Sequence, residues 1–263
     1  MFWHAFKVLR GALVFTAFYC SGAFYGLVLL PLVSLFIREP VAQMRRCQYL
    51  VSTAFRWTLD LLRFCRIVDF DSRRIDATLP KGPCLLIANH PSTIDVVAVL
   101  SVFREASVVV KRKIWDDRFL RYLFRYCGHI DGGDGSLEAN IAVLEGVKER
   151  LAQGFPVVIF PEGGRSPAGG LATMHKGAFS IASTIGIDLI PLVIECDPPA
   201  LHKDAPWHAL PEQPVRYTVR MLPPVRGANS TARKLQREVT ELYRRELGLL
   251  DTGAAAGATA AQP

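Results

Sequence analysis

The first 75 residues carry the most hydrophobic stretch of the chain. From Gly11 to Ile37, 27 consecutive residues include no Asp, Glu, Lys or Arg. As a straight helix this run would be about 40 Å long, more than the roughly 30 Å hydrocarbon core of a bilayer. It is too long for the apolar region of a signal peptide, and no small-residue cleavage site follows it. We therefore expect a retained membrane segment, which Pro31 should kink or end near Leu30.

After Pro40 the hydrophobic pattern has the period of a helix. The apolar positions are Met44, Cys47, Val51, Ala54, Trp57, Leu61 and Phe64, and Arg45, Arg46, Arg56, Arg63 and Arg66 lie among them. This pattern predicts a basic amphipathic helix on an anionic membrane face. Basic residues favour the cytoplasmic side, so we predict that the chain is attached to the cytoplasmic face of the inner (cell) membrane. Lys7 and Arg10 precede the apolar run, which leaves both a full span and a hairpin open.

Residues 76–228 alternate short apolar runs with helical patterns. The runs Cys84–Ala88, Ser107–Val110, Val157–Phe160 and Leu189–Ile194 predict buried strands, and Arg216–Met221 predicts an added edge strand. Alternation of strands and helices is typical of a sheet covered by helices. We therefore predict an α/β fold with a mixed, mostly parallel sheet flanked by helices, preceded by a hydrophobic and amphipathic helical membrane region.

Three regions follow from these patterns. Residues 1–75 form the membrane-associating helical region, and residues 76–228 form the α/β domain. Residues 229–263 contain a charged helix, Thr231–Leu247, and an Ala/Gly-rich tail, Gly253–Pro263, which we expect to be disordered.

Charge and cysteine content narrow the choice of partners. The net charge is +7, half of the residues are hydrophobic, and the mean hydropathy is +0.22. This excess of positive charge suits membrane phospholipids or acidic substrates. The chain has neither a zinc-finger spacing nor an RNA-binding aromatic motif, so we expect no nucleic-acid partner. Six cysteines without a paired short spacing indicate neither a zinc site nor a disulfide framework, which favours a reducing cytoplasmic location.

The first candidate site follows the strand Cys84–Ala88, in the segment Asn89–Asp95. Functional groups gather where strands of an α/β sheet end, and the loop can fold the carboxylate of Asp95 back toward His90. An imidazole oriented in this way can take a proton from a hydroxyl. Alternatively, Ser92 and Asp95 form a capping box and His90 is a hydrogen-bonded loop residue. This segment alone leaves both interpretations open.

The second candidate site follows the strand Val157–Phe160 and reads Pro161-Glu162-Gly163-Gly164-Arg165-Ser166. The two glycines allow backbone amides to approach a ligand closely, and Arg165 offers a bidentate partner for phosphate. The local alternatives are a helix cap or ion pair for Glu162 and a surface charge for Arg165.

In this order and spacing, the two segments resemble the blocks of the lysophosphatidic-acid (1-acylglycerol-3-phosphate) acyltransferase family of glycerolipid acyltransferases. Asn89–Asp95 matches its Asn-His-x4-Asp block, and Phe160–Ser166 matches Phe-Pro-Glu-Gly-Thr-Arg-Ser except for Gly164. Lys176-Gly177-Ala178 and the apolar stretch around Pro191 resemble the blocks that follow. The resemblance covers roughly residues 80 to 195.

The resemblance implies an O-acyltransferase that works without an acyl-enzyme, a metal or a cofactor. His90 would act as general base with Asp95 holding its tautomer, and the hydroxyl of a lysophospholipid would attack the thioester of acyl-CoA or acyl-carrier protein. Glu162, Gly163 and Arg165 would bind the acceptor. We also assign Lys113 and Lys176 to substrate binding.

One block departs from the family's pattern. The family commonly carries an Arg that holds the acceptor phosphate, whereas the stretch Gly128–Asp134 here contains none and is acidic. Either Lys111, Arg112 or Lys113 supplies the charge, or the acceptor belongs to a specialised pathway, such as one that makes ornithine lipids. The basic stretch Arg104–Arg125 is either a docking surface for acidic headgroups or carrier protein or a solvated helix face. A membrane-binding protein without catalysis is the alternative from another class, and the oligomeric state is not predicted.

Overall fold

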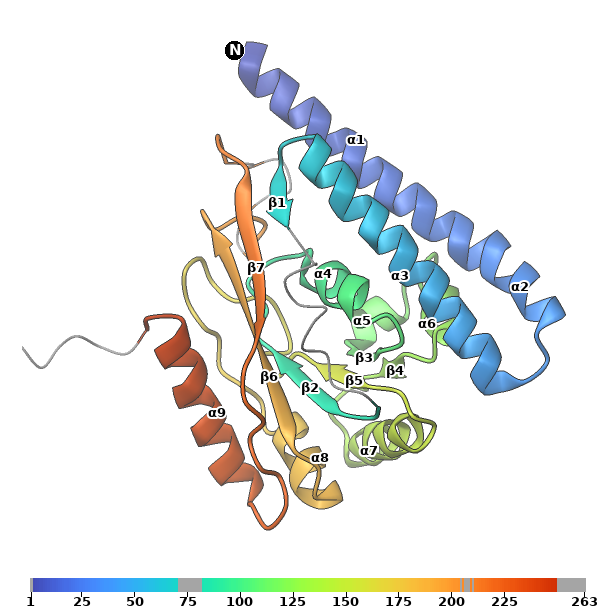
Figure 1. Cartoon of the computed structure of the whole chain (residues 1–263), viewed down its shortest axis with the longest axis vertical. Coiled ribbons are helices and arrows are strands. Elements are labelled where there is room, and N and C mark those ends of the chain that lie inside the picture. Colours follow the sequence, from blue (N-terminus) through green and yellow to red (C-terminus); the bar gives the residue numbers. More distant parts are fainter. Residues whose placement is uncertain (1, 71–81, 204, 206–208, 210, 250–263) are drawn as a thin grey trace, which may run out of the picture.

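In the part of the chain that the structure describes, seven strands form one mixed sheet at the centre of the molecule (Figure 1). The computed structural model describes residues 2–70, 82–203, 205, 209 and 211–249. The strand order is β1-β7-β6-β2-β5-β3-β4. The strands are β1 (Val68–Phe70), β2 (Leu85–Ala88), β3 (Ser107–Val110), β4 (Ile130–Asp131), β5 (Val157–Ile159), β6 (Leu189–Asp197) and β7 (Val215–Met221). Only β6 and β7 pair in antiparallel fashion, so the predicted fold class is confirmed.

The position of β7 differs from the prediction. The strand forms where the pattern placed it, but it pairs with both β6 and β1 and therefore lies inside the sheet. The prediction of an edge strand was wrong because β1, a three-residue strand before residue 76, was not recognised in the sequence. The sheet thus includes part of the segment that we assigned to the membrane region. The predicted disordered tail, 253–263, lies outside the described residues.

Helices cover both faces of the sheet, which explains why the central strand β2 is a continuous apolar run. Leu86 and Ala88 face one buried cluster, shared with α4 (Asp95–Val102) and α3 (Pro40–Phe64). Leu85 and Ile87 face the other, beneath α7 (Leu137–Ala152), α8 (Gly177–Ile185) and α9 (Ala232–Glu246). Two short helices, α5 (Arg112–Trp115) and α6 (Arg121–Tyr126), connect β3 to β4.

The N-terminal region is a helical hairpin. α1 (Phe2–Phe24), the π-helical turn η1 (Tyr25–Leu29) and α2 (Leu30–Phe36) form one rod that runs beside α3 (Figure 1). Of the two predicted effects of Pro31, a kink or an end near Leu30, the structure shows a local distortion: the rod continues, with a π-helical turn directly before Leu30. The Leu30 N–H donates to the carbonyl oxygen of Tyr25, five residues back, and Pro31 lies at the start of α2, where its missing N–H is tolerated. The distortion that Pro31 causes is therefore a π-helical turn.

The predicted amphipathic helix is α3. Met44, Cys47 and Val51 are buried, whereas Trp57 and Phe64 are 68% and 85% exposed. In the rod, Val8–Phe36 is long and apolar enough to cross a membrane by length and composition. Exposed aromatic side chains on α3 beside this apolar rod indicate membrane association.

Candidate active site

The two predicted site segments meet because the strands that precede them are neighbours. β2 and β5 are parallel, with Ile87 opposite Ile159, so the loops that follow both strands leave the same edge of the sheet. The Ser166 N–H donates to the carbonyl oxygen of His90 at 2.7 Å. Residues about 70 positions apart in the sequence therefore form one site.

Asn89 fixes the point at which the chain leaves β2. Its side-chain amide donates to the carbonyl oxygen of Ile194 at 2.8 Å, and its Oδ1 accepts the Ile194 N–H at 2.7 Å. The amide is buried and acts as a cross-strand link to β6. The following residue, His90, thus starts from a position set by the sheet.

His90 and Asp95 form a close hydrogen-bonded pair. The distance from His90 Nδ1 to Asp95 Oδ2 is 2.6 Å. Asp95, the first residue of α4, has a fully buried side chain, whereas the side chain of His90 is 17% exposed. Since Asp95 occupies Nδ1, Nε2 is the ring nitrogen left for a substrate. This is the arrangement that a general base needs.

Asp95 also takes part in a capping contact. Its Oδ2 accepts the Ser92 N–H at 2.8 Å, and its Oδ1 accepts a hydrogen bond from the Tyr217 hydroxyl. The N-cap residue of α4 is Ile94, without a side-chain cap, so Ser92 does not cap the helix through its hydroxyl. One carboxylate oxygen therefore makes the contacts that both interpretations expect, to the imidazole and to a backbone N–H, while the catalytic role of His90 stays a prediction. Burial raises the pKa of Asp95, and the hydrogen bonds from its neighbours partly offset that effect.

Glu162 braces the backbone of His90. Its Oε1 accepts the His90 N–H at 2.7 Å, and its Oε2 accepts the Ser166 hydroxyl and the Ala172 N–H, each at 2.7 Å. The residue is 5% exposed, and burial raises the pKa of its carboxyl. Its role in acceptor binding stays a prediction, while its contacts are those of a structural brace.

Gly163 and Arg165 have different surroundings. Gly163 has a φ of 62°, and a Cβ at this position would lie 3.1 Å from Cδ2 of His175. A side chain would therefore be both strained and crowded. Arg165 Nη1 lies within 3.0 Å of the Thr93 hydroxyl oxygen and of the carbonyl oxygens of Leu201 and His202. This nitrogen connects the loop after β6 to the loop after β2.

Of the three cations proposed to replace the missing Arg, Lys111 lies beside the loop after β5. Its Nζ donates to the carbonyl oxygen of Gly163 at 3.3 Å. Arg112 instead pairs with Asp116 at 2.8 Å and Asp131 at 2.7 Å. Lys113 and Lys176 are exposed, and neither forms a hydrogen bond or ion pair with the described residues of the two loops. Their role in substrate binding stays a prediction.

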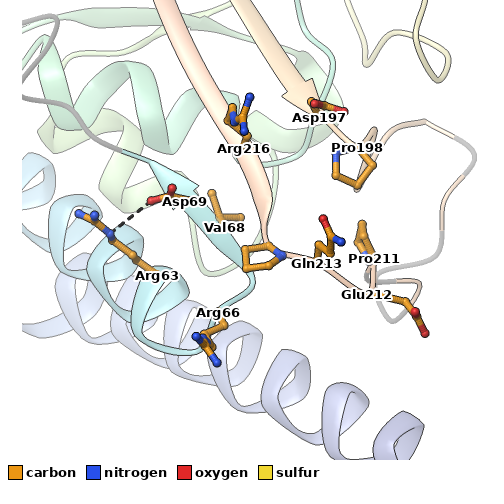
Figure 2. A pocket seen from close by; sticks show the side chains of 11 residues that line it. Arg63, Arg66, Val68, Asp69, Asp197, Pro198, Pro211, Glu212, Gln213 and Arg216 are labelled. Carbon is orange, nitrogen blue, oxygen red and sulfur yellow. Dashed lines mark ion pairs between the residues drawn. The ribbon is translucent and has the colours of Figure 1, made fainter.

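A cavity of about 770 Å³ lies at the sheet edge formed by β1, β7 and the end of β6, away from the two loops (Figure 2). Arg63, Arg66 and Arg216 line it together with acidic residues, and Arg63 pairs with Asp69 at 3.4 Å. The predicted site residues are not among the residues that line this cavity. We therefore do not assign the acceptor site to this cavity.

Tyr217 is the site residue that sequence reasoning missed. The pattern identified the strand that carries it but gave no reason to connect this tyrosine with Asp95, 122 positions earlier. An aromatic residue inside a predicted strand is ordinarily a core residue. Only the pairing of β7 with β6 brings it to the site.

The mixed sheet thus carries a His–Asp pair at the carboxyl ends of its strands, and a second glycine-containing loop holds the backbone of the histidine. Residues 71–195 match the model of the Acyltransferase family. The predicted resemblance to glycerolipid acyltransferases is thereby confirmed for this part of the chain.

Individual relatives agree with this family. The chain is 28% identical to a 1-acyl-sn-glycerol-3-phosphate acyltransferase of Chlamydomonas reinhardtii, over 44% of this chain and 35% of that protein. It is 25% identical to one of Pseudomonas aeruginosa, over 61% of this chain and 62% of that protein. The chain thus spans about a third of the algal relative and less than two thirds of the bacterial one.

A solved structure shares the fold. The crystal structure of the 1-acyl-sn-glycerophosphate acyltransferase PlsC from Thermotoga maritima matches with a TM-score of 0.69 and 21% identity. The match covers 92% of this chain and 96% of that chain, so the N-terminal helices and the sheet belong to one shared architecture.

Proposed function

We propose that this protein transfers a fatty-acyl group from acyl-CoA or acyl-carrier protein to the hydroxyl of a lysophospholipid such as 1-acylglycerol-3-phosphate. His90 Nε2 takes the hydroxyl proton while the oxygen attacks the thioester carbonyl carbon. The tetrahedral intermediate collapses as the carbon–sulfur bond breaks, and the thiolate takes the proton back from His90. The new bond is the oxygen ester, and this chemistry needs neither a metal nor a cofactor.

The observation that carries this proposal is the 2.6 Å contact between His90 Nδ1 and Asp95 Oδ2. It holds the tautomer in which Nδ1 carries the proton and Nε2 is the base. The names of the relatives support a glycerolipid acceptor. They do not distinguish the two thioester donors.

For the anionic group of the acceptor we propose Lys111 as the binding cation. Its ammonium group lies against the Gly163 carbonyl, beside the loop that braces His90. The acidic turn after β4 favours a second candidate function, acyl transfer to an acceptor of a specialised lipid pathway. Asp131, the last residue of β4, pairs with Arg112 and accepts the Gly133 N–H, and residues 128–134 include no Lys or Arg that could bind a phosphate.

Thiol release tests these proposals together. Purified protein is given acyl-CoA or acyl-carrier protein with a panel of acceptors that includes 1-acylglycerol-3-phosphate and lyso-ornithine lipid. We expect acceptor-dependent thiol release, and a Lys111→Ala variant should raise the acceptor KM about 10-fold, as expected for one lost charged contact.

The Lys113→Ala variant shows whether that lysine contributes to acceptor binding. Lys148→Ala, on the exposed face of α7, serves as the control. No release with any acceptor would support the non-catalytic membrane protein instead.

We further propose that the helical hairpin attaches the protein to the cytoplasmic face of the inner membrane without crossing it. The rod of α1, η1 and α2 packs along α3, and Gly26 lies against the start of α6, where a Cβ would be 3.2 Å from the carbonyl oxygen of Phe119 and 3.5 Å from the Leu123 nitrogen. A rod packed along the body of the protein is suited to lie in the interface. A tag at residue 1 should therefore resist external protease in intact spheroplasts and become accessible in inverted vesicles; cleavage in spheroplasts would indicate a full span.

A further inference from the structure

Tyr217 lies at the end of a hydrogen-bonded chain that starts at His90. Its hydroxyl donates to Asp95 Oδ1, while Asp95 Oδ2 faces the imidazole. The ring of Tyr217 packs edge-on against Phe70, with centroids 5.6 Å apart and an interplanar angle of 85°. Both the hydroxyl and the ring are therefore held in a fixed orientation.

This contact is buried and comes from outside the region that matches the acyltransferase family. Tyr217 is 2% exposed and lies on β7, after residue 195. Its neighbour across the strands is Cys196 of β6. A hydrogen bond to a carboxylate from which water is excluded is stronger than one at the surface.

We propose that Tyr217 is a positioning residue for acyl transfer, which fixes the rotation of the Asp95 carboxylate and stabilises its negative charge so that Oδ2 stays directed at His90. Without this donor, Oδ1 would be a buried acceptor with no partner, and the carboxylate could turn away from the imidazole. The inference rests on the proposed function in that it assigns the catalytic base to His90. Tyr217 contacts the carboxylate of Asp95 and acts on His90 through it.

The hydrogen-bonded series His90–Asp95–Tyr217 predicts how the activity depends on pH. The other titratable groups beside it in the described structure are Glu162, near His90, and the thiol of Cys196, near Asp95. Burial raises the pKa of both Asp95 and Tyr217, so the phenol remains a donor at neutral pH. Uptake of one proton changes the net charge of the His90–Asp95 pair from −1 to 0. A donor to Asp95 therefore stabilises the unprotonated, active pair more than the protonated one.

The test is Tyr217→Phe, which removes the hydroxyl and keeps the ring against Phe70. We expect kcat to fall about 10-fold with the KM of both substrates unchanged, as for one lost charge-assisted hydrogen bond. The acidic limb of the kcat/KM profile should move to higher pH. The matched control is Tyr243→Phe, a fully buried tyrosine of α9 whose hydroxyl donates to the carbonyl oxygen of Ile87 at 2.7 Å. Its pH profile should equal that of the wild type.

A measurement that needs no turnover separates this role from the proposed function. In protein labelled with ¹⁵N-histidine, the His90 Nδ1 proton should resonate at low field, and His90→Gln identifies its signal by loss. Tyr217→Phe should shift that signal and Tyr243→Phe should not. An unshifted signal or an unmoved acidic limb in Tyr217→Phe would overturn the proposal. If wild-type protein transferred no acyl group, the proposed function would fail, and the resonance would still decide whether Tyr217 positions the pair.

Discussion

Replacing His90 by alanine is expected to lower the rate of acyl transfer by about 10²–10⁴-fold, the usual contribution of a positioned general base. The imidazole is the group at this edge of the sheet that combines partial exposure with an oriented second nitrogen, held by Asp95 at 2.6 Å. Without it, the acceptor hydroxyl must lose its proton to water. The measurement is acceptor-dependent thiol release at saturating substrate, for the variant and for wild-type protein. Equal melting temperatures of the two proteins show that the variant is folded.

His175→Ala provides the comparison for this variant. Its imidazole lies beside Gly163 but is not among the partners of Asp95, so its loss should lower the rate by less than about 10-fold. If the His90→Ala rate stayed within threefold of wild type, His90 would not be the base.

The second large effect is expected from Glu162→Gln. The carboxylate accepts hydrogen bonds from two N–H groups and one hydroxyl, and an N–H donor faces each of its two oxygens. A glutamine amide keeps only one of these oxygens as an acceptor. The variant places an NH₂ group opposite at least one of these donors. We expect a loss of about 1–3 kcal/mol in the free energy of unfolding, the cost of a buried polar group without its partner.

The kinetic result distinguishes the brace from an acceptor-binding group. Because Glu162 holds the His90 backbone, the imidazole should be misplaced, and kcat should fall by about 10–10²-fold while the acceptor KM changes little. A rise in acceptor KM with kcat preserved would instead support acceptor binding by Glu162. The control is Glu195→Gln, an exposed carboxylate of β6 that pairs with Arg220 at 3.2 Å, which should alter neither constant by more than about twofold.

The contacts of Glu162 and Ser166 also give a physical reason why the two motifs occur together. The first loop supplies the base and its partner, and the second supplies acceptors and donors for the backbone of the base. Glu162 accepts the His90 N–H while the Ser166 N–H donates to the His90 carbonyl oxygen. The backbone of His90 is thus held on both sides, and Asp95 orients its imidazole, before any substrate arrives. This is the preorganisation that catalysis requires.

Several features of this protein were determined by the sequence itself. Continuous apolar runs identified the central strands, because a strand covered by helices on both faces has no polar side. The period of apolar residues after Pro40 identified α3, and the residues that follow β2 and β5 identified the chemistry of the candidate site. These patterns are local, since each depends on residues within a few positions of one another.

The tertiary structure alone decided which distant groups meet at the site. Three partners of the loop after β2 come from far along the chain: Glu162 is 72 positions from His90, Ile194 is 105 positions from Asn89, and Tyr217 is 122 positions from Asp95. The choice of Lys111 over Arg112 likewise depended on Asp116 and Asp131 pairing with the arginine. Sequence patterns report the faces and ends of single elements, whereas these contacts depend on which strands become neighbours and in which register.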